Sequence, residues 1–320
     1  MAAQAVSDRA GAIAKLADLL AHKRQPVAFL TGAGMSVAAG IPDFRSPGGM
    51  YDTLRPELLT ATAAERRAMA SDPTAVVSWE LFQRNPLPYL ELRRPFMIRV
   101  LGDRAADAQA YAPTLAHFFM RLCHDKGLLR RVYTQNIDGL DYKTGIPADK
   151  MIAVHGSLGR VECERCGAPY PSVDFVAALK TNIKDIYGLD PDAPAESRGI
   201  PCGACGAAAV KPATVLYGRA LPREFFRHKD TDLADLPLLI IAGTSLTVFP
   251  AASVATDAPA QTAKAVFDKV PRGSGGEALF VQGDCDESFL DLCRECGWVE
   301  DLRQYRPLMA AQSRALLDRA

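Results

Sequence analysis

Six of the eight cysteines in this 320-residue sequence form three Cys-x-x-Cys pairs, each followed by glycine. Thiolates at this spacing can hold a metal ion where the chain turns sharply. Two of the pairs lie among glycine, proline and polar residues without helical periodicity. Together these two pairs supply the four ligands of a closed, structural zinc site, whereas a redox dithiol would need only one pair. The sequence therefore predicts one structural zinc ion bound by Cys163, Cys166, Cys202 and Cys205.

The third pair, Cys293 and Cys296, has a different environment. It continues the helical spacing of apolar residues from Phe289, and Gly297 is placed to end that helix. We therefore interpret both cysteines as small apolar residues on a buried helix face. A disulfide framework fits poorly, because the chain is long and shows no secretory hydrophobic segment at its start.

A glycine-rich segment, Thr31–Ser36, directly follows the apolar run Val27–Leu30. Glycines after a buried strand let the backbone approach a phosphate closely, and the N-terminus of a following helix favours anions. The segment is no P-loop, because Gly-Lys-Ser/Thr is absent, and Gly40 follows Gly34 too late for a standard dinucleotide fingerprint. Taken alone, it could bind a nucleotide or be an ordinary tight turn. The next residues, Gly40–Tyr51, place Phe, Asp and Arg in an exposed loop, which favours closure on a ligand.

Short apolar runs alternate with helical patterns along most of the chain. This alternation predicts a doubly wound parallel, Rossmann-like sheet of the α/β class. Residues 258–277, rich in glycine and proline near their end, are expected to be a loop. Strands are expected at 27–30, 128–133, 151–154, 236–242 and 278–281, and helices at 11–24, 109–126 and 286–296.

Two stretches break the alternation, and we expect them to form a smaller helical and zinc-ribbon domain. They are residues 48–100, which are helical in pattern, and residues 158–214, which hold the zinc cysteines around a helical piece at 172–187. The Rossmann-like domain would then comprise 11–47, 101–157 and 215–300, followed by a C-terminal helical tail at 301–320.

The composition excludes some classes of function. Lysine and arginine number 37, as do aspartate and glutamate, so the net charge is zero and direct nucleic-acid binding is not expected. No apolar run approaches the ~18 residues of a membrane span, so no membrane insertion is expected. Asp8 and Asp18 are untypical of a transit peptide. We expect the protein in the cytosol, the nucleus or both.

Several separated motifs together resemble the sirtuin (Sir2-like) family of NAD-dependent protein deacylases, over roughly residues 11–300. Each motif is weak alone, but their combination in the family's order is specific. The motifs are Gly32–Ser36, Gly40–Ser46, Thr134–Leu140, His155–Ser157, the two zinc pairs, Gly243–Leu246 and Pro250–Ala252.

The resemblance implies that NAD binds as co-substrate at the carboxyl ends of the strands. The glycine segment and Arg45 would face its diphosphate, and the residues after Ala242 would hold adenosine. Phe44, Ile137 and Asp138 would form the nicotinamide pocket, with the Asp138 carboxylate accepting from the carboxamide. The implied NAD-binding residues are Ala33, Gly34, Phe44, Arg45, Gln135, Asn136, Ile137, Asp138, Gly243, Thr244, Ser245, Asp268 and Cys285.

The implied reaction transfers the acyl group of a modified lysine to ADP-ribose. Nicotinamide leaves as the acyl oxygen attacks the ribose, and a ribose hydroxyl then attacks the resulting imidate with help from a base. His155 would be that base, because imidazole titrates near neutral pH. Gln135 would orient the imidazole and ribose, and Asn136 would position ribose or water. The implied catalytic residues are thus His155, Asn136, Asp138 and Gln135, and we interpret His22, His117, His124 and His228 as structural.

The resemblance also implies acyl-lysine-bearing proteins, histones or others, as partners. The substrate would add as a strand to an exposed edge, by β-augmentation. The implied substrate-binding residues are Val215, Tyr217, Gly218 and Val248. Family members commonly carry Phe-Gly-Glu on this edge, whereas Arg219 follows Gly218 here, so flanking-residue preference should differ.

The acyl group is predicted from the helical segment around Leu90 and Arg93. Sirtuins that remove acidic acyl groups place a tyrosine and an arginine there, and Arg93 could match the arginine. Leu90 stands at the tyrosine position, which favours acetyl or longer apolar chains over succinyl. We therefore prefer a deacetylase.

Three alternatives remain open from the sequence. An NAD-dependent oxidoreductase would share the fold but transfer hydride. A non-catalytic zinc-ribbon interaction protein would keep the cysteines without needing His155 or Asp138. A protein ADP-ribosyltransferase would use the same pocket.

Overall fold

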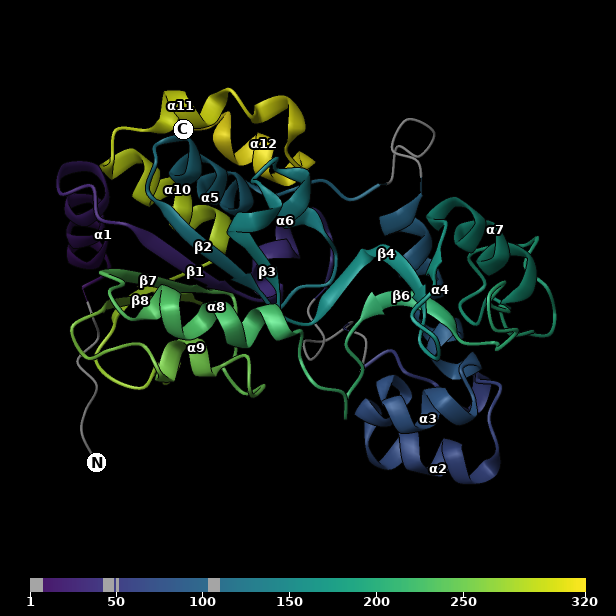
Figure 1. The fold of residues 1–320 in the computed structure, drawn as a ribbon. Coiled ribbons are helices and arrows are strands. Elements are labelled where there is room, and N and C mark those ends of the chain that lie inside the picture. Colours follow the sequence, from purple (N-terminus) through teal and green to yellow (C-terminus); the bar gives the residue numbers. More distant parts are fainter. Residues whose placement is uncertain (1–7, 43–48, 50–51, 103–109) are drawn as a thin grey trace.

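The computed structural model describes residues 8–42, 49, 52–102 and 110–320, which form two lobes (Figure 1). The larger lobe contains a parallel sheet in the order β3-β2-β1-β7-β8-β9. The chain winds outward from β1 in one direction and from β7 in the other, so the predicted doubly wound sheet is confirmed, with its switch point between β1 and β7. The strands are β1 (Val27–Thr31), β2 (Leu129–Thr134), β3 (Met151–Ala153), β7 (Leu238–Ala242), β8 (Ala263–Asp268) and β9 (Leu279–Gln282).

Helices cover both faces of this sheet, as the alternation of buried side chains along β1 requires. Phe29 belongs to the core under α1, α5 and α10, whereas Leu30 belongs to the core under α8 and α9. The helices of the first face are α1 (Arg9–Ala17), extended by the π-helix η1 (Asp18–His22), α5 (Leu115–Asp125), α10 (Cys285–Glu295), α11 (Val299–Arg303), η6 (Arg306–Leu308) and α12 (Ala311–Leu317). The second face carries α8 (Arg223–Leu233) and α9 (Ser253–Thr256).

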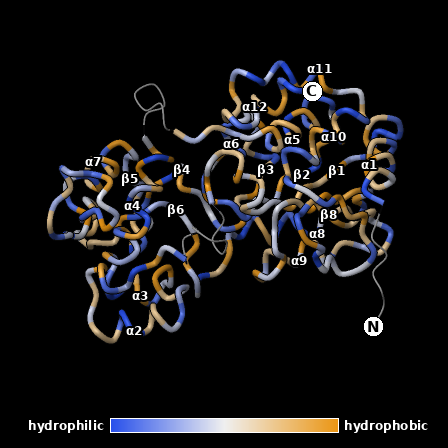
Figure 2. The backbone as a smooth tube through the Cα atoms, turned by 180° about the vertical axis from the view of Figure 1, so that it is seen from behind, coloured by the Kyte–Doolittle hydropathy of each residue, from blue (hydrophilic) through white to orange (hydrophobic). Residues whose placement is uncertain are grey.

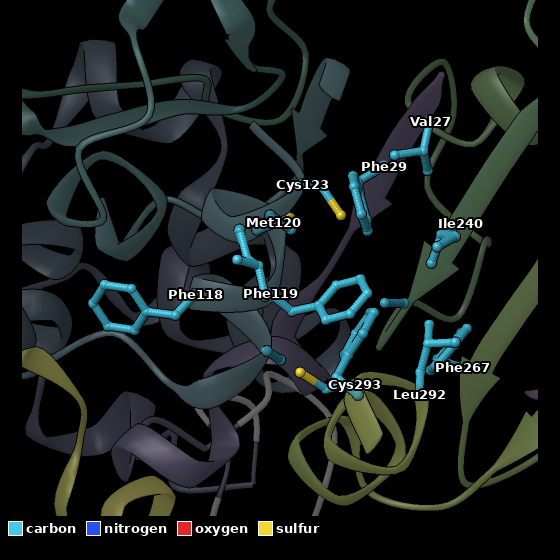
Figure 3. Close-up of a cluster of buried hydrophobic side chains, with 14 of the residues drawn as sticks. Val27, Phe29, Phe118, Phe119, Met120, Cys123, Ile240, Phe267, Leu292 and Cys293 are labelled. Atoms are coloured by element: carbon cyan, nitrogen blue, oxygen red, sulfur yellow. The ribbon is translucent and has the colours of Figure 1, made fainter. Parts of the chain in front are cut away.

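An aromatic cluster forms the centre of the first core. Side chains from β1, α5, β7, β8 and α10 converge there (Figure 3). Phe289 of α10 stacks on Phe267 with ring centroids 4.5 Å apart and lies 4.9 Å from the ring of Phe119. Cys293, on the same helix, is fully buried, as the sequence predicts, whereas Cys296, the C-cap residue of that helix, is only partly buried.

Truncating Phe289 to alanine is expected to lower the free energy of unfolding by about 3–5 kcal/mol, because the neighbouring rings cannot collapse into the cavity. Thermal and chemical denaturation would measure the loss. Phe226→Ala is the matched control: this phenylalanine is 49% exposed on α8, so its loss should stay below about 1 kcal/mol. Equal losses in both variants would contradict a packed aromatic centre.

The smaller lobe has its own core, built from separate parts of the chain. Its antiparallel sheet, in the order β5-β4-β6, comprises β4 (Gly156–Cys163), β5 (Pro169–Tyr170) and β6 (Val210–Thr214). Hydrophobic and hydrophilic stretches alternate along the chain in both lobes, as seen from behind (Figure 2). The lobe's helices are η3 (Pro56–Leu58), α2 (Ala63–Ser71), η4 (Pro73–Val77), α3 (Trp79–Arg84), α4 (Leu87–Leu101) and α7 (Ser172–Asn182).

Two expectations about elements are wrong. Residues 263–268 form β8 rather than a loop. Lys264, which interrupts the apolar run, is tolerated inside the strand because its buried ammonium group donates to the Ser274 carbonyl at 3.1 Å. The helix expected at 109–126 begins at Leu115, where Thr114 and His117 form a capping box.

The C-terminal helix is tied to the centre of the larger lobe through Asp286. The carboxylate of Asp286 accepts from the Ala116 N–H at 3.0 Å and from the Ser313 hydroxyl at 2.5 Å. Thr114, the residue before α5, donates from its Oγ1 to the Met35 carbonyl at 2.9 Å. Residues of α12 therefore support the loop after β1. None of the helices in the described part is long and apolar enough to cross a bilayer.

Candidate functional site

The loops that follow β1 and β7 touch at the switch point of the sheet. The Gly34 N–H donates to the Gly243 carbonyl at 2.9 Å. Gly34 is the second residue of a short 3₁₀ helix, η2 (Ala33–Ala39). A Cβ on Gly34 would lie 2.6 Å from Gly243 Cα, and Gly243 itself has φ +60°. These glycines therefore allow two backbones to meet, and in this conformation the Gly34 N–H is engaged by protein.

Substituting Gly34 with alanine is expected to destabilise the larger lobe by about 1–3 kcal/mol, because the added methyl group meets backbone rather than a movable side chain. The melting temperature would show this. Gly273→Ala is the control, since no atom lies within 4 Å of a Cβ there and its φ is not positive. An unchanged melting temperature for Gly34→Ala would contradict the close approach of the loops.

The residues after β2 bind both of these loops. Asn136 Nδ2 donates to the Gly32 carbonyl at 2.9 Å, and Gln135 Nε2 donates to Thr244 Oγ1 at 2.8 Å. The Ile137 carbonyl accepts from Leu158 N–H at 2.8 Å and so reaches the smaller lobe. The segment after β2 thus links the loops of three strands and both lobes.

Asp138 is a buried carboxylate with two donors. Ser36 Oγ donates to its Oδ2 at 2.7 Å, and the Leu140 N–H donates to its Oδ1 at 2.9 Å. Burial, followed by the charge of Asp141, raises the pKa of Asp138, whereas these donors and His117 lower it. Asp138 also lines a cavity of about 600 Å³, whose walls include Gly156 and Ser157.

His155 follows β3 and is held by the backbone. Its Nδ1 lies 2.9 Å from the Gln135 carbonyl oxygen, which can only accept, so Nδ1 carries the proton. The neutral imidazole therefore presents a lone pair at Nε2. Burial lowers the pKa of His155, although the Gln135 hydrogen bond opposes the shift. The Gln135 side chain, which the sequence suggested as the orienting group, donates to Thr244 instead.

The residues expected on the adenosine side lie at the ends of β7, β8 and β9. Ser245 Oγ is 2.8 Å from Thr247 Oγ1, and Asp268 Oδ1 accepts from the Val270 N–H at 3.1 Å. Cys285 is the first residue of α10, and burial, with Asp286 and Asp268 nearby, raises the pKa of its thiol. Phe44 and Arg45 lie outside the described residues.

The expected substrate edge begins beside His155, because the Val215 N–H donates to the His155 carbonyl at 2.8 Å. Further along, Tyr217 pairs with the segment at Ser78, and its carbonyl accepts from the Trp79 N–H at 2.9 Å. Gly218 adopts φ +91° directly afterwards. In the segment after β7, the Val248 carbonyl accepts from the Ala252 N–H at 2.9 Å.

The four predicted zinc cysteines come together between β4 and β6. Their sulfur atoms all lie within 4.8 Å of one another, with 3.7 Å between Cys163 and Cys205 and 3.7 Å between Cys166 and Cys202. Four sulfurs at about 2.3 Å from a tetrahedral zinc ion are about 3.8 Å apart, so the set fits one structural zinc ion.

The glycine after each pair explains the backbone of the two knuckles. Gly167 and Gly206 both have φ +72°, and their N–H groups donate to the carbonyls of Cys163 and Cys202, each at 2.8 Å. The N–H groups of Cys205 and Ala204 lower the pKa of Cys202 to about 7, whereas burial raises the pKa of Cys163. A zinc ion would favour the thiolate form of all four cysteines.

Sequence reasoning missed two residues next to Asp138. His117 and Asp141 are fully buried beside it, although His117 was expected to be only structural. A signal was present: Asp141 lies three residues after Asp138, one helical turn, at the start of α6 (Leu140–Lys143).

Comparison with known proteins gives the family. The Sir2 family model matches residues 32–250. The chain is 34% identical to the "NAD-dependent protein deacetylase hst2" of Schizosaccharomyces pombe, over 91% of this chain and 78% of that protein. It is 35% identical to the "NAD-dependent protein deacetylase sirtuin-3" of Mus musculus, over 77% of this chain and 60% of that protein.

A third relative supports the same family, and a solved structure has the same fold. The "NAD-dependent protein deacetylase sirtuin-2" of Danio rerio is 30% identical over 94% of this chain and 74% of its own length. A structure described under "Structural Basis for the Mechanism and Regulation of Sir2 Enzymes" has the same fold, with TM-score 0.67 and 24% identity, over 90% of this chain and 98% of that chain. The chain belongs to the Sir2 family.

Proposed function

We propose that this chain, like its named relatives, is an NAD-dependent protein-lysine deacetylase that releases nicotinamide, free lysine and O-acetyl-ADP-ribose. The observation that carries the proposal is the position of His155. Its imidazole presents an unprotonated Nε2, and its backbone carbonyl accepts from the Val215 N–H at the start of the expected substrate edge. A base, a buried acceptor and a strand edge at the switch point of a doubly wound sheet are the groups that the proposed reaction needs.

Bound NAD supplies the nicotinamide leaving group and the ADP-ribose that receives the acyl group. The chain's own residues bind and orient the reactants. We assign the diphosphate to Ala33, Gly34 and Arg45, and the nicotinamide pocket to Phe44, Ile137 and Asp138. Adenosine is assigned to Gly243, Thr244, Ser245, Asp268 and Cys285.

His155 acts as the general base, and Asn136 and Gln135 hold the ribose near it. The Gln135 carbonyl fixes the tautomer by accepting from Nδ1–H, so Nε2 can take a proton from a ribose hydroxyl. Because the Gln135 side chain also donates to Thr244, a single residue aligns the base with the loop after β7.

The pH dependence follows from the charge of the base. Neutral imidazole is the active form, so kcat/KM should be full above the pKa of His155 and fall as pH drops through it. Since burial lowers this pKa, the acid limb should lie below the ordinary value near 6.5. Initial rates between pH 5 and 8 would test this, and an acid limb above the ordinary value would contradict it.

The proposed substrates are acetylated proteins, histones among them, bound along Val215, Tyr217, Gly218 and Val248. Leu90 stands where sirtuins that remove acidic acyl groups carry a tyrosine; it is buried in the apolar core of the smaller lobe and offers no hydroxyl to an acidic acyl group, which supports an apolar one. A peptide series carrying acetyl-, myristoyl- and succinyl-lysine should show acetyl or myristoyl turnover well above succinyl. Preferred turnover of succinyl-lysine would overturn this choice.

Mass spectrometry of the products from NAD and an acetyl-lysine peptide tests the function directly. The expected products are nicotinamide and O-acetyl-ADP-ribose in equal amounts, with one deacetylated peptide for each. Formation of reduced cofactor would instead indicate hydride transfer. ADP-ribose attached to protein would indicate the transferase, and intact NAD would indicate a non-catalytic protein.

A further inference from the structure

A buried polar cluster lies beside the proposed nicotinamide pocket. It contains His117 of α5 and the carboxylates of Asp138 and Asp141, whose ligand atoms lie within 4.8 Å of one another. Asp138 is 3% exposed and lines the cavity of about 600 Å³, and His117 and Asp141 are 0% and 1% exposed. Of the three, Asp138 is the one on the cavity wall, with the other two residues packed behind it.

Two polar atoms of the cluster face each other without another partner. His117 Nε2 lies 3.9 Å from Asp141 Oδ1, and neither atom makes a hydrogen bond among the described residues. Leaving both atoms unpaired in a dry interior would be unfavourable, which points to an interaction between them across a short gap.

The other polar atoms of the two residues are held by threonines. The Thr114 N–H donates to His117 Nδ1 at 3.2 Å, and the Thr114 hydroxyl, which donates to the Met35 carbonyl, lies 2.7 Å from the same nitrogen. The second oxygen of Asp141 accepts from Thr134 Oγ1 at 2.9 Å. A single proton between His117 Nε2 and Asp141 Oδ1 would therefore satisfy both facing atoms.

We propose that His117 and Asp141 are positioning residues that together set the pH range over which Asp138 stays ionised as the acceptor for the nicotinamide carboxamide, with His117 favouring the charge of Asp138 and Asp141 opposing it. This inference rests on the proposed function of Asp138. As the pH falls, the His117–Asp141 pair takes up a proton first, and Asp138 keeps its charge. Asp138 can do so because Ser36 and the Leu140 N–H both donate to it.

The surrounding charges support opposite effects of the two residues on Asp138. The negative charge of Asp141 raises the pKa of Asp138 after burial, whereas His117 lowers it. Burial lowers the pKa of His117 and raises that of Asp141 to about 6. Asp286 of α10 also faces His117, but its carboxylate is bound by the Ala116 N–H and the Ser313 hydroxyl.

Two variants that preserve the local contacts test the proposal. Asp141→Asn keeps an acceptor for Thr134 but removes the like charge beside Asp138. His117→Gln keeps a capping-box side chain for the Thr114 N–H but removes the imidazole. The readout is the inhibition constant of nicotinamide as a function of pH. Nicotinamide binding should weaken, and this constant should rise, as Asp138 becomes protonated.

The two variants should move this acid midpoint in opposite directions. Charges about 4 Å apart in a protein interior change a pKa by about one unit or more, so Asp141→Asn should lower the midpoint by about that amount and His117→Gln should raise it. The KM for the acetyl peptide should stay unchanged in both. His124→Gln, on the same helix and partly exposed, is the matched control and should leave the midpoint unchanged.

Unchanged midpoints, or shifts in the same direction, would overturn the positioning role. If His117→Gln fails to fold, the lowered midpoint of Asp141→Asn alone still decides the question. Absence of nicotinamide release by the unaltered enzyme is a different result, because it removes the proposed function itself.

Discussion

Replacing His155 with alanine is expected to lower the deacetylation rate by a factor of about 10²–10⁴, which is the usual contribution of a general base. The imidazole is held by one hydrogen bond, from Nδ1–H to the Gln135 carbonyl at 2.9 Å. Its loss therefore removes the base but leaves strand pairing and the core intact. Product formation from NAD and an acetyl-lysine peptide would measure the rate, and circular dichroism and melting would confirm the fold.

His22→Ala is the control for the His155 variant, because the His22 side chain is 77% exposed on the far end of η1 and should leave the rate unchanged. Comparing two rates shows which step His155 serves. If the base is needed only for the second step, nicotinamide release should be less affected than formation of the acylated product. Normal turnover by His155→Ala would eliminate the proposed base.

Removing the zinc ion is expected to unfold the smaller lobe and abolish activity. Structural zinc binds with an apparent free energy of about 10–16 kcal/mol, comparable to the whole stability of a domain. The three-stranded sheet depends on this, since β4 ends at Cys163 and β6 begins soon after Cys205. Cys202→Ser should lose the metal, measured by elemental analysis, together with the deacetylase activity.

Cys296→Ala is the matched control for zinc loss. It removes a cysteine of the third Cys-x-x-Cys pair, on the opposite lobe, and should retain one zinc ion per chain. Loss of metal from this variant, or full activity in metal-free Cys202→Ser protein, would contradict the assignment of the four ligands.

Much of the larger lobe can be predicted from sequence because its two central strands, β1 and β7, are buried throughout. Val27–Thr31 and Leu238–Ala242 are buried at every position, which is what a central parallel strand requires. β8 escaped prediction because Lys264 breaks its apolar run, and only the folded chain shows the carbonyls that accept from its ammonium group. The three strands of the smaller sheet were not predicted for a similar reason, since polar residues and the zinc-binding cysteine pairs interrupt their apolar pattern.

The site was predictable as a set of residues but not as a set of contacts. Spacing and motif identify His155 and Asp138, but not that a backbone carbonyl orients the imidazole. Nor does the sequence reveal that Gly34 and Gly243 touch, since more than two hundred positions separate them. The role proposed for His117 could not be inferred from the sequence, because a lone histidine is by default interpreted as structural and only the fold brings it beside Asp138 and Asp141.

The tie between Asp286 and Ser313 has a consequence for protein synthesis. A ribosome makes the chain from its N-terminus, so the loop around Met35 emerges long before the helix that contains Ser313. A nascent polypeptide therefore lacks the last brace of its nucleotide crevice until the helix that contains Ser313 has been made. A chain truncated before Ser313 should yield a protein whose sheet is folded but whose crevice is loosely organised.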